Sequence, residues 1–264
     1  MQPVLFISHG APTFTLEPNR TTAAWQSLAA SLIERPRVVL WVSAHWDGDR
    51  LRLAGGVPVP RIQYDFYGFP EPFYRLGWPT PSGSDEAEWL LARLNELGIE
   101  VSAEPAWGLD HGVWVPGRCM WPEPIVPSLQ LSLVQPRGAA WHLDLGRRLA
   151  LLRDEGVLII GSGGAVHNLG EIDWHAPEGQ AVAWAQQFAD ALEGALETGM
   201  TDRLLEPWSQ PFGRRAHPTV EHYLPLVVAA AAGSDDSCQV LHRNWLYGSL
   251  ALHVFGWGVT ARSA

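Results

Sequence analysis

The chain has 264 residues, 47% of them hydrophobic, and a formal net charge of −10 at pH 7. This length allows one large domain or two small ones, and an acidic chain without a basic run argues against nucleic acid or an anionic membrane surface as a partner. All 18 basic residues are arginine, which excludes Schiff-base, pyridoxal-phosphate and phosphate-loop chemistry because each needs a lysine.

The cysteines and the absence of targeting signals bear on the cellular compartment. Cys119 and Cys238 lie far apart and form no CxxC pattern, which excludes a disulfide framework and a thiolate metal site. The sequence shows neither an N-terminal basic-then-apolar signal nor an apolar run long enough to span a bilayer. We therefore expect a cytoplasmic protein without membrane association, and a homo-oligomer is compatible with the sequence.

The N-terminal part predicts a β-α-β unit. Residues 4–7 and 38–42 are short apolar runs, which are typical of buried strands. Between them, Thr21 and Thr22 predict the start of a helix that ends before Pro36. Parallel strands need such a crossover, so the two strands are expected to run in the same direction.

Residues 48–80 show neither helical nor strand periodicity, and residues 61–74 are rich in aromatic side chains and proline. The aromatic content argues against disorder. Two interpretations stay open. The segment from about Tyr64 to Tyr74 either folds over a site and contributes an aromatic wall, or packs against the outside of the sheet.

The middle of the chain alternates helices and strands. Ser84 predicts the start of a helix that Gly98 ends, and Pro127 indicates a bulge or a sheet edge. In chain order we expect a helix over 84–97, a strand over 99–103, an irregular loop over 107–114, a strand over 125–133 and a helix over 141–153.

The run 157–160 predicts a buried strand, and the four residues from Gly161 to Gly164 predict a tight turn after it. This glycine run lacks the GxGxxG spacing of a nucleotide loop, and Ser162 does not stand in a GxSxG hydrolase pattern. Downstream we expect a helix over 180–198, a helix within 217–233 that starts at Pro218 or Pro225, and two β segments, 238–242 and 246–255.

These elements together predict an α/β fold. We expect three layers, with a mostly parallel central sheet, helices on both faces and a C-terminal antiparallel edge. Because the sequence contains no repeat, low-complexity tract or linker, residues 1–264 are expected to form one domain.

Three predicted strands each deliver a histidine to their carboxyl ends, namely His9, His45 and His167. Ligands of open α/β sheets bind outside this edge, and neutral imidazole is the commonest metal ligand. The pattern therefore indicates one imidazole-lined site for a divalent metal. The segment from His217 to His222 has one residue too many for the HxxEH pattern, which argues against a metalloprotease.

Five motifs in chain order carry a resemblance to a known family. They are Ser8-His9-Gly10-Ala11-Pro12, Ser43-Ala44-His45-Trp46, Asp110-His111-Gly112-Val113-Trp114, His167-Asn168-Leu169 and Pro218-Thr219-Val220-Glu221-His222-Tyr223-Leu224-Pro225-Leu226. With these motifs, which span nearly the whole chain, the sequence resembles the class III extradiol ring-cleaving dioxygenases of the DOPA-dioxygenase type.

The resemblance implies that His9, His45 and His222 bind a divalent metal ion. It implies that His167 is the acid–base residue, which in some metal-bound members also lies close enough to be a fourth ligand. His111 is implied to line the substrate pocket and to share in proton transfer. Tyr223, within the last motif, is expected to bind substrate as well.

The implied reaction is cleavage of the ring of a small catechol by O2 at a non-haem Fe(II) ion. An imidazole titrates near ~6.5, so His167 is expected to take and return a proton near neutrality. Three or four imidazoles hold Zn(II) as easily as Fe(II). A zinc-bound hydrolase or an enzyme of unknown reaction on the same scaffold therefore stays an alternative, and a non-enzymatic metal-binding module is a third.

Overall fold

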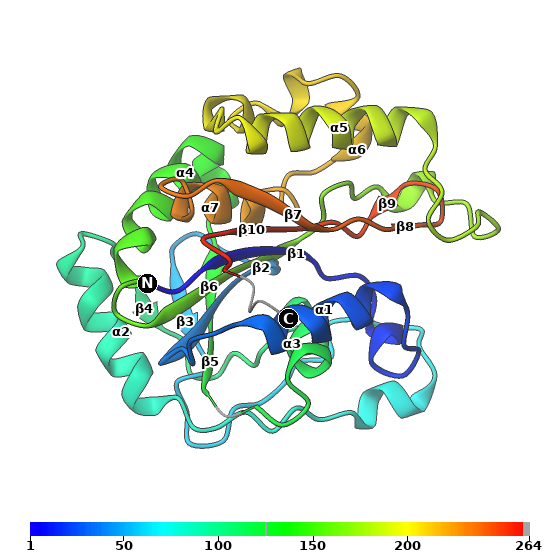
Figure 1. Ribbon diagram of the computed structural model, residues 1–264. Helices are drawn as coiled ribbons and strands as arrows, with labels where there is room; N and C mark the ends of the chain where they lie inside the picture. The colour runs from blue at the N-terminus through cyan, green and yellow to red at the C-terminus, as the bar shows by residue number, and fades with distance from the viewer. Residues whose placement is uncertain (125, 261–264) are drawn as a thin grey trace.

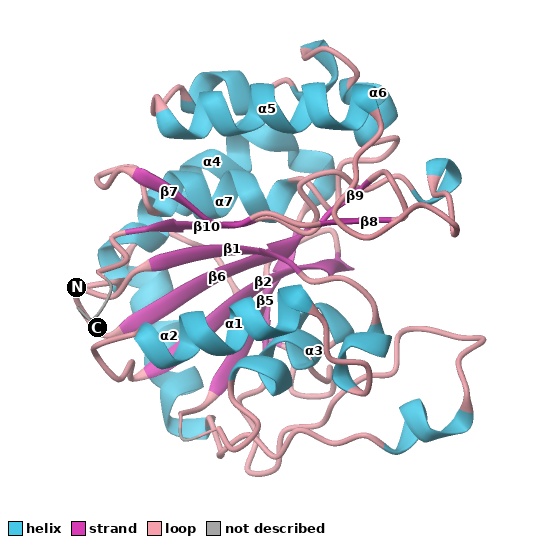
Figure 2. Ribbon diagram, turned by 45° about the vertical axis from the view of Figure 1, so that its right-hand side comes forward, coloured by secondary structure: helices cyan, strands magenta, loops and turns pink. Residues whose placement is uncertain are grey.

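The computed structural model describes residues 1–124 and 126–260. Within these residues, eight strands form one sheet that lies between two layers of helices (Figures 1 and 2). The strands of this sheet are β1 (Val4–Ser8), β2 (Val38–Asp47), β3 (Arg52–Ala54), β4 (Ser102–Ala103), β5 (Ser128–Leu133), β6 (Val157–Gly163), β7 (Cys238–His242) and β10 (Val254–Trp257). The short strands β8 (Trp245–Leu246) and β9 (Leu250–Ala251) pair separately.

The sheet has the spatial order β4-β3-β5-β2-β6-β1-β10-β7. Its four central strands, β5, β2, β6 and β1, are parallel neighbours. On one side β3 runs antiparallel to β5, and on the other β10 runs antiparallel to both β1 and β7. The predicted mostly parallel sheet with a C-terminal antiparallel edge is therefore confirmed, and the carboxyl ends of the central strands share one edge.

Helices cover both faces of the sheet (Figure 2). They are α1 (Arg20–Ser31), α2 (Ser84–Glu96), α3 (His111–Met120), α4 (Gly138–Leu149), α5 (Ala183–Glu197), α6 (Gly213–Ala216) and α7 (Leu224–Ala232). In Figures 1 and 2, α4, α5 and α7 lie above the sheet, whereas α1 and α3 lie below it. The expected three-layer arrangement is confirmed.

Alternation along the strands divides the core between the two faces. In β1, Val4 and Phe6 belong to one hydrophobic cluster, with α4, α5 and α7, whereas Leu5 and Ile7 belong to the other, with α1 and α3. All four side chains are fully buried. A strand covered on both faces can be apolar at every position, which explains why these strands appear in the sequence as unbroken apolar runs.

One predicted loop is wrong, because residues 111–120 form helix α3. The expectation failed because Gly112, Pro116 and Gly117 all disfavour helix formation within a ten-residue segment. Tertiary contacts override those preferences: nine of the ten residues of α3 are buried. His111 is thus the first residue of a helix, with Asp110 in the N-cap position.

The predicted tight turn at Gly161–Gly164 is also wrong, because β6 continues through Gly163. The glycines serve close packing instead. A Cβ at Gly161 would overlap the carbonyl oxygen of Pro225, and a Cβ at Gly163 would overlap that of His222. These glycines allow the backbone that enters α7 to lie directly on β6.

Several element boundaries differ from the expectation. The segment 48–80 contains β3, and the expected strand over 99–103 shortens to β4. Pro127 precedes β5, which is an interior strand and not an edge, while Ile125 lies outside the described residues. Of the two proposed starts for the last helix, Pro225 is the one found in the first turn of α7.

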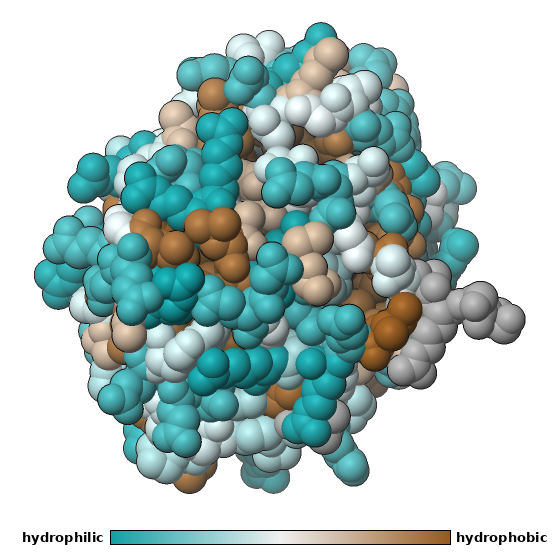
Figure 3. All heavy atoms as spheres, turned by 60° about the vertical axis from the view of Figure 1, so that its left-hand side comes forward, coloured by the Kyte–Doolittle hydropathy of each residue, from teal (hydrophilic) through white to brown (hydrophobic). Residues whose placement is uncertain are grey.

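The surface that faces the viewer in Figure 3 is mainly hydrophilic, with small hydrophobic patches separated by polar residues. Such scattered apolar residues are normal on a protein surface. Among the described residues, no helix combines the length and apolar character needed to cross a membrane.

Candidate active site

Five histidines from separate elements meet at the carboxyl edge of the central strands. His9 follows β1, His45 lies near the end of β2, His111 starts α3, and His167 and His222 follow β6 and precede α7. The ring centroid of His9 lies 4.8 Å from that of His45 and 5.4 Å from that of His222. The His45 and His222 centroids are 4.9 Å apart. The structure therefore brings together all five histidines assigned to the site from the sequence.

Ser162 on β6 orients His9. Its Oγ lies 3.0 Å from His9 Nδ1 and donates its own proton to the carbonyl oxygen of Gly112. That carbonyl is free because Pro116, four residues later in α3, has no N–H to donate to it. Since the serine proton is committed to Gly112, Ser162 accepts a hydrogen bond from His9 Nδ1–H, and the Nε2 lone pair of His9 stays free.

Asp65, in the aromatic segment, orients two further histidines. Its Oδ2 accepts a hydrogen bond of 2.8 Å from His111 Nδ1 and lies 3.5 Å from His45 Nδ1. Its Oδ1 accepts a 2.8 Å bond from the backbone N–H of His111, at the N-terminus of α3. The carboxylate therefore holds the Nδ1 proton of His111 and faces Nδ1 of His45.

Glu221 has the same role for His222. Its Oε1 lies 3.2 Å from His222 Nδ1, while His222 Nε2 is buried and has no hydrogen-bond partner among the described residues. Burying an unpartnered nitrogen is unfavourable unless a ligand satisfies it. The amide of Gly164 also donates to the His222 carbonyl at 3.0 Å, which ties His222 to the end of β6.

His167 stacks on His222. Their ring centroids are 3.5 Å apart, and the ring planes differ by 4°. The backbone N–H of His167 donates to the carbonyl of Ala216 at 3.0 Å, which fixes the segment after β6 against α6. Within the part of the chain that the structure describes, His167, Glu221 and His222 form one of two groups whose side-chain atoms lie close enough to hold a metal ion, and His9, His45 and His111 form the other.

Burial lowers the pKa of four of the site imidazoles and keeps them neutral, namely His9, His45, His167 and His222. Burial and then the neighbouring histidines lower the pKa of His9 and His222 well below 6.5. Burial lowers the pKa of His45 to about 3, although Asp65 opposes the shift. For His167, burial lowers the pKa to about 4 although Glu221 opposes the shift, so the expected titration near 6.5 is wrong. Neutral imidazole is the form that binds metals.

A network of buried hydrogen bonds next to His45 and His111 supports the site. Asp110, which is fully buried, accepts a 2.7 Å hydrogen bond from Ser43 Oγ and another from Gln130 Nε2. The Ser43 hydroxyl in turn accepts a 3.2 Å hydrogen bond from the backbone N–H of His45. Burial, and then the charge of Asp65, raise the pKa of Asp110 to about 6. The network links the start of α3 to β2 and thereby fixes the relative positions of His45 and His111.

The donor set fits a bound divalent cation. His9 Nε2 and His45 Nε2 lie 2.9 Å apart, and their other ring nitrogens face Ser162 and Asp65. Two lone pairs at this separation repel each other unless a cation lies beside both. Imidazole nitrogens bind zinc at about 2.0–2.1 Å, which brings adjacent ligand atoms roughly 3 Å apart. His222 Nε2 is also buried and unpartnered among the described residues, and its ring centroid lies 5.4 Å from that of His9 and 4.9 Å from that of His45.

The two residues expected to bind substrate, His111 and Tyr223, lie in different environments. The ring centroid of His111 is 3.9 Å from that of His45, so His111 borders the histidine cluster. Tyr223 instead is 1% exposed and packs in the core against His217. The structure therefore does not place the Tyr223 ring among the site histidines.

The aromatic segment lies against the cluster, as the first of its two interpretations expects. Phe66 makes an edge contact with His111 at a centroid distance of 6.0 Å, and Gln63 accepts a 2.9 Å hydrogen bond from the Trp114 indole. Tyr67 at its tip is 92% exposed. Phe66 belongs to the expected aromatic wall, but Asp65 was not expected as a site residue, because nothing local in the sequence links it to histidines 20 or more positions away.

Fold and site together define an α/β protein with a cluster of five histidines, suited to hold a metal ion, at the carboxyl edge of a parallel sheet. A family model described as the catalytic LigB subunit of aromatic ring-opening dioxygenase matches residues 3–255. The chain therefore belongs to the LigB family of class III extradiol dioxygenases, whose members are metal-dependent.

Two named relatives and a solved structure are similar to this protein over most of the chain. The chain is 36% identical over 233 residues to the 4,5-DOPA dioxygenase extradiol of Escherichia coli, covering 87% of this chain and 84% of the relative. It is 35% identical to the protein of the same name from Beta vulgaris, covering 91% and 90%. A crystal structure of an uncharacterised Escherichia coli K12 protein matches with a TM-score of 0.82 and 31% identity, covering 98% of this chain and 100% of the other.

Proposed function

We propose that the protein is an Fe(II)-dependent extradiol dioxygenase that opens the ring of a small catechol, with His9, His45 and His222 as the metal ligands. One observation carries this proposal: three imidazoles converge with their Nδ1 atoms bonded to or facing Ser162, Asp65 and Glu221, while the Nε2 atoms of His9 and His45 face each other at 2.9 Å and that of His222 has no partner among the described residues. Three protein ligands leave positions open for a bidentate catechol and for O2.

In this proposal the bound Fe(II) supplies a Lewis acid for the diol and an electron path between catechol and O2. The protein's own residues handle the protons. Neutral His167 accepts a hydroxyl proton of the catechol at its unprotonated ring nitrogen, and the nearby Glu221 stabilises the resulting imidazolium. His167 returns the proton as the carbon–carbon bond beside the diol breaks. Both atoms of O2 enter the product, as a carboxylate and a carbonyl oxygen.

His111 and Phe66 are the proposed walls of the substrate site. Asp65 holds the Nδ1 proton of His111, so the free Nε2 of His111 faces the histidine cluster and accepts a hydrogen bond from the substrate. The Phe66 ring, in edge contact with His111, supplies an apolar surface for the aromatic ring of the substrate. The names of the relatives make DOPA one catechol to test.

Anaerobic reconstitution with Fe(II), followed by O2 and a panel of catechols including DOPA, tests the proposal. We expect O2 consumption and a yellow ring-opened product with at least one member of the panel. A protein that binds Fe(II) but consumes no O2 with any catechol would contradict it. His45→Ala, assayed in parallel, controls for reactions of free iron.

Zn(II) on the same ligands is the second candidate, because an all-imidazole donor set suits zinc as well as iron. Zinc would activate water in place of O2 and would favour a hydrolytic reaction. Metal analysis of freshly isolated protein, produced with iron supplied and zinc depleted, separates the two. Activity that follows zinc content and is independent of O2 would support the zinc enzyme.

A further inference from the structure

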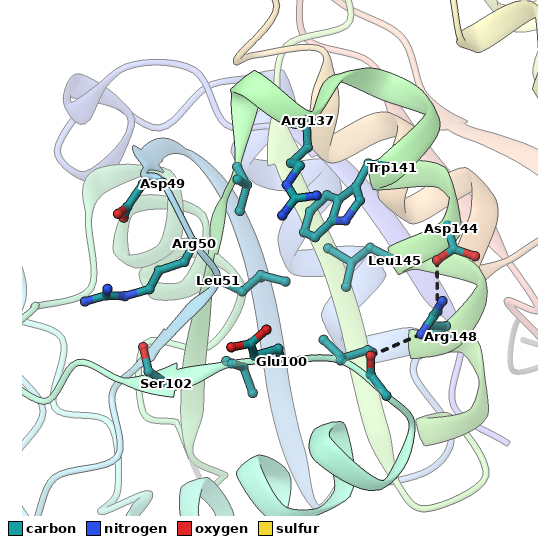
Figure 4. A pocket seen from close by; sticks show the side chains of 14 residues that line it. Asp49, Arg50, Leu51, Glu100, Ser102, Arg137, Trp141, Asp144, Leu145 and Arg148 are labelled. Carbon is teal, nitrogen blue, oxygen red and sulfur yellow. Dashed lines mark hydrogen bonds and ion pairs between the residues drawn. The ribbon is translucent and has the colours of Figure 1, made fainter.

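A cavity lies away from the histidines, between α4 and the segment that leads into β4 (Figure 4). Its volume is about 370 Å³, within the range of small-molecule sites. Leu51, Ile99, Val134 and Leu145 supply its apolar lining, and Trp141 forms one wall. None of the five site histidines lines it.

One face of α4 forms a wall of this cavity. Trp141, Leu145 and Arg148 follow one another at intervals of four and three residues, so their side chains lie on the same side of the helix. Arg148 donates to Asp144 at 2.9 Å and to the carbonyl of Gly98 at 3.1 Å. These bonds, drawn in Figure 4, hold α4 against the turn after α2. Because Arg148 and Asp144 pair with each other, their charges are already balanced within this wall.

Among the described residues, two oppositely charged side chains that point into the cavity, those of Arg137 and Glu100, have no protein partner. Asp49 is paired with Arg52 at 2.5 Å. Neither the Arg137 guanidinium nor the Glu100 carboxylate has an ion-pair or hydrogen-bond partner in the described parts of the chain. In Figure 4, Arg137 enters the cavity beside Trp141, Glu100 enters it from the other side, and Arg50 extends away from Trp141.

We propose that this cavity binds a zwitterionic α-amino acid with an aromatic or large apolar side chain. The carboxylate of the ligand pairs with Arg137, its ammonium group pairs with Glu100, and its side chain packs on Trp141 and the apolar lining. A simple anion would be repelled by Glu100 and a simple cation by Arg137. Arg137 and Glu100 form no ion pair with each other in the structure. A zwitterion would pair with both of them at once. The proposal is independent of metal binding and of ring cleavage.

Titration of the isolated protein with L-phenylalanine, followed by saturation-transfer NMR, tests this site. L-phenylalanine carries no diol, so it cannot be ring-cleaved at the histidine centre. We expect it to bind with a measurable Kd. 3-Phenylpropionate lacks the ammonium group and 2-phenylethylamine lacks the carboxylate, so each should bind roughly two- to fivefold more weakly, as expected for partly exposed ion pairs.

Matched variants locate the binding. Arg137→Gln should weaken L-phenylalanine binding roughly two- to fivefold and remove its advantage over 2-phenylethylamine. Glu100→Gln should remove the difference in Kd between L-phenylalanine and 3-phenylpropionate. Arg147→Gln, in α4 but outside the cavity, should leave every Kd unchanged. Because all three side chains are exposed, the variants should fold normally.

Three results would overturn the proposal. One is that L-phenylalanine shows no binding at concentrations up to about 10 mM, which means a binding free energy smaller in magnitude than about 3 kcal/mol. Another is equal binding of L-phenylalanine and 3-phenylpropionate to the unmodified protein. The third is unchanged binding in both Arg137→Gln and Glu100→Gln, which would place the ligand elsewhere. None of these results bears on the proposed dioxygenase activity.

Discussion

Ser162 and His9 are 153 positions apart in sequence, yet the Ser162 hydroxyl lies 3.0 Å from His9 Nδ1 and sets the tautomer of that imidazole. The hydroxyl proton goes to Gly112, whose carbonyl is free because Pro116 interrupts the hydrogen bonding of α3. A proline within a helix thus determines which nitrogen of a histidine on another element is free to bind metal.

Ser162→Ala should weaken metal binding about 10- to 100-fold, as is usual when the partner that orients a metal-binding histidine is removed. Without the hydroxyl, His9 is free to adopt the other tautomer or to rotate. A competitive chelator titration measures the effect. Ser132→Ala, another buried serine on the sheet but away from the histidines, should leave metal affinity unchanged. Equal losses in both variants would mean that general destabilisation is the cause.

His45→Ala should abolish both metal binding and turnover. The unmodified protein should gain about 2.7 kcal/mol of stability at a metal concentration of 100 times Kd, because the ion binds the folded state. The variant should gain none. Thermal unfolding with and without Fe(II) or Zn(II) measures this difference. His175→Ala, at an exposed histidine outside the cluster, is the control that should retain the full gain.

His167→Ala separates a proton-transfer residue from a metal ligand. We expect metal content to fall little and kcat to fall by roughly two orders of magnitude or more. Added imidazole should restore part of the lost activity, because it can occupy the vacated space and transfer the proton. Loss of the metal in parallel with activity would instead make His167 a ligand first.

Asp65→Asn should reduce kcat/KM about 10- to 100-fold. Burial raises the pKa of Asp65, but hydrogen bonds from His111 and the neighbouring imidazoles outweigh burial, and the carboxylate stays charged. The side-chain amide of the Asp65→Asn variant has one oxygen, so it cannot accept hydrogen bonds from both His111 Nδ1 and the His111 backbone while it faces His45. The rings of His45 and His111 would therefore lose their orientation. Steady-state kinetics measure the change against Asp154→Asn, at an exposed position. Unchanged kinetics in Asp65→Asn would remove Asp65 from the site.

Gly163→Ala should lower the free energy of unfolding by about 1–3 kcal/mol and weaken metal binding. The added Cβ overlaps the carbonyl oxygen of His222 and displaces that histidine from the site. Urea unfolding and metal titration measure the two effects. Gly194→Ala, in α5 with no atom within 4 Å of the added Cβ, should instead be neutral or stabilising by up to about 1 kcal/mol.

Much of the fold was predictable because its main elements carry local patterns. The apolar runs of β1, β2 and β6, buried on both faces, predict parallel strands, and Gly98 and Gly233 predict where helices end. Helix α3 was not predictable, because its glycines and proline contradict local propensity and only burial between the sheet and the aromatic segment stabilises it.

The candidate site divides in the same way. The histidines were found because they occupy strand ends or family motifs, both of which are visible in one sequence. Asp65, Ser162 and the true role of the glycines at 161 and 163 were not found, because each acts on a residue that is distant in sequence. Tyr223 was assigned to the substrate site from its place in a motif, and the structure places its side chain in the core.

The sequence by itself determined the order of the elements, the parallel character of the sheet and the identity of the histidines, because hydrophobic periodicity and motif order are properties of short segments. Only the tertiary structure decided which ring nitrogens are free, which carboxylates orient them and how closely α7 approaches β6. Those features depend on hydrogen bonds and van der Waals contacts between distant segments, and no local pattern of residues encodes the distances between them.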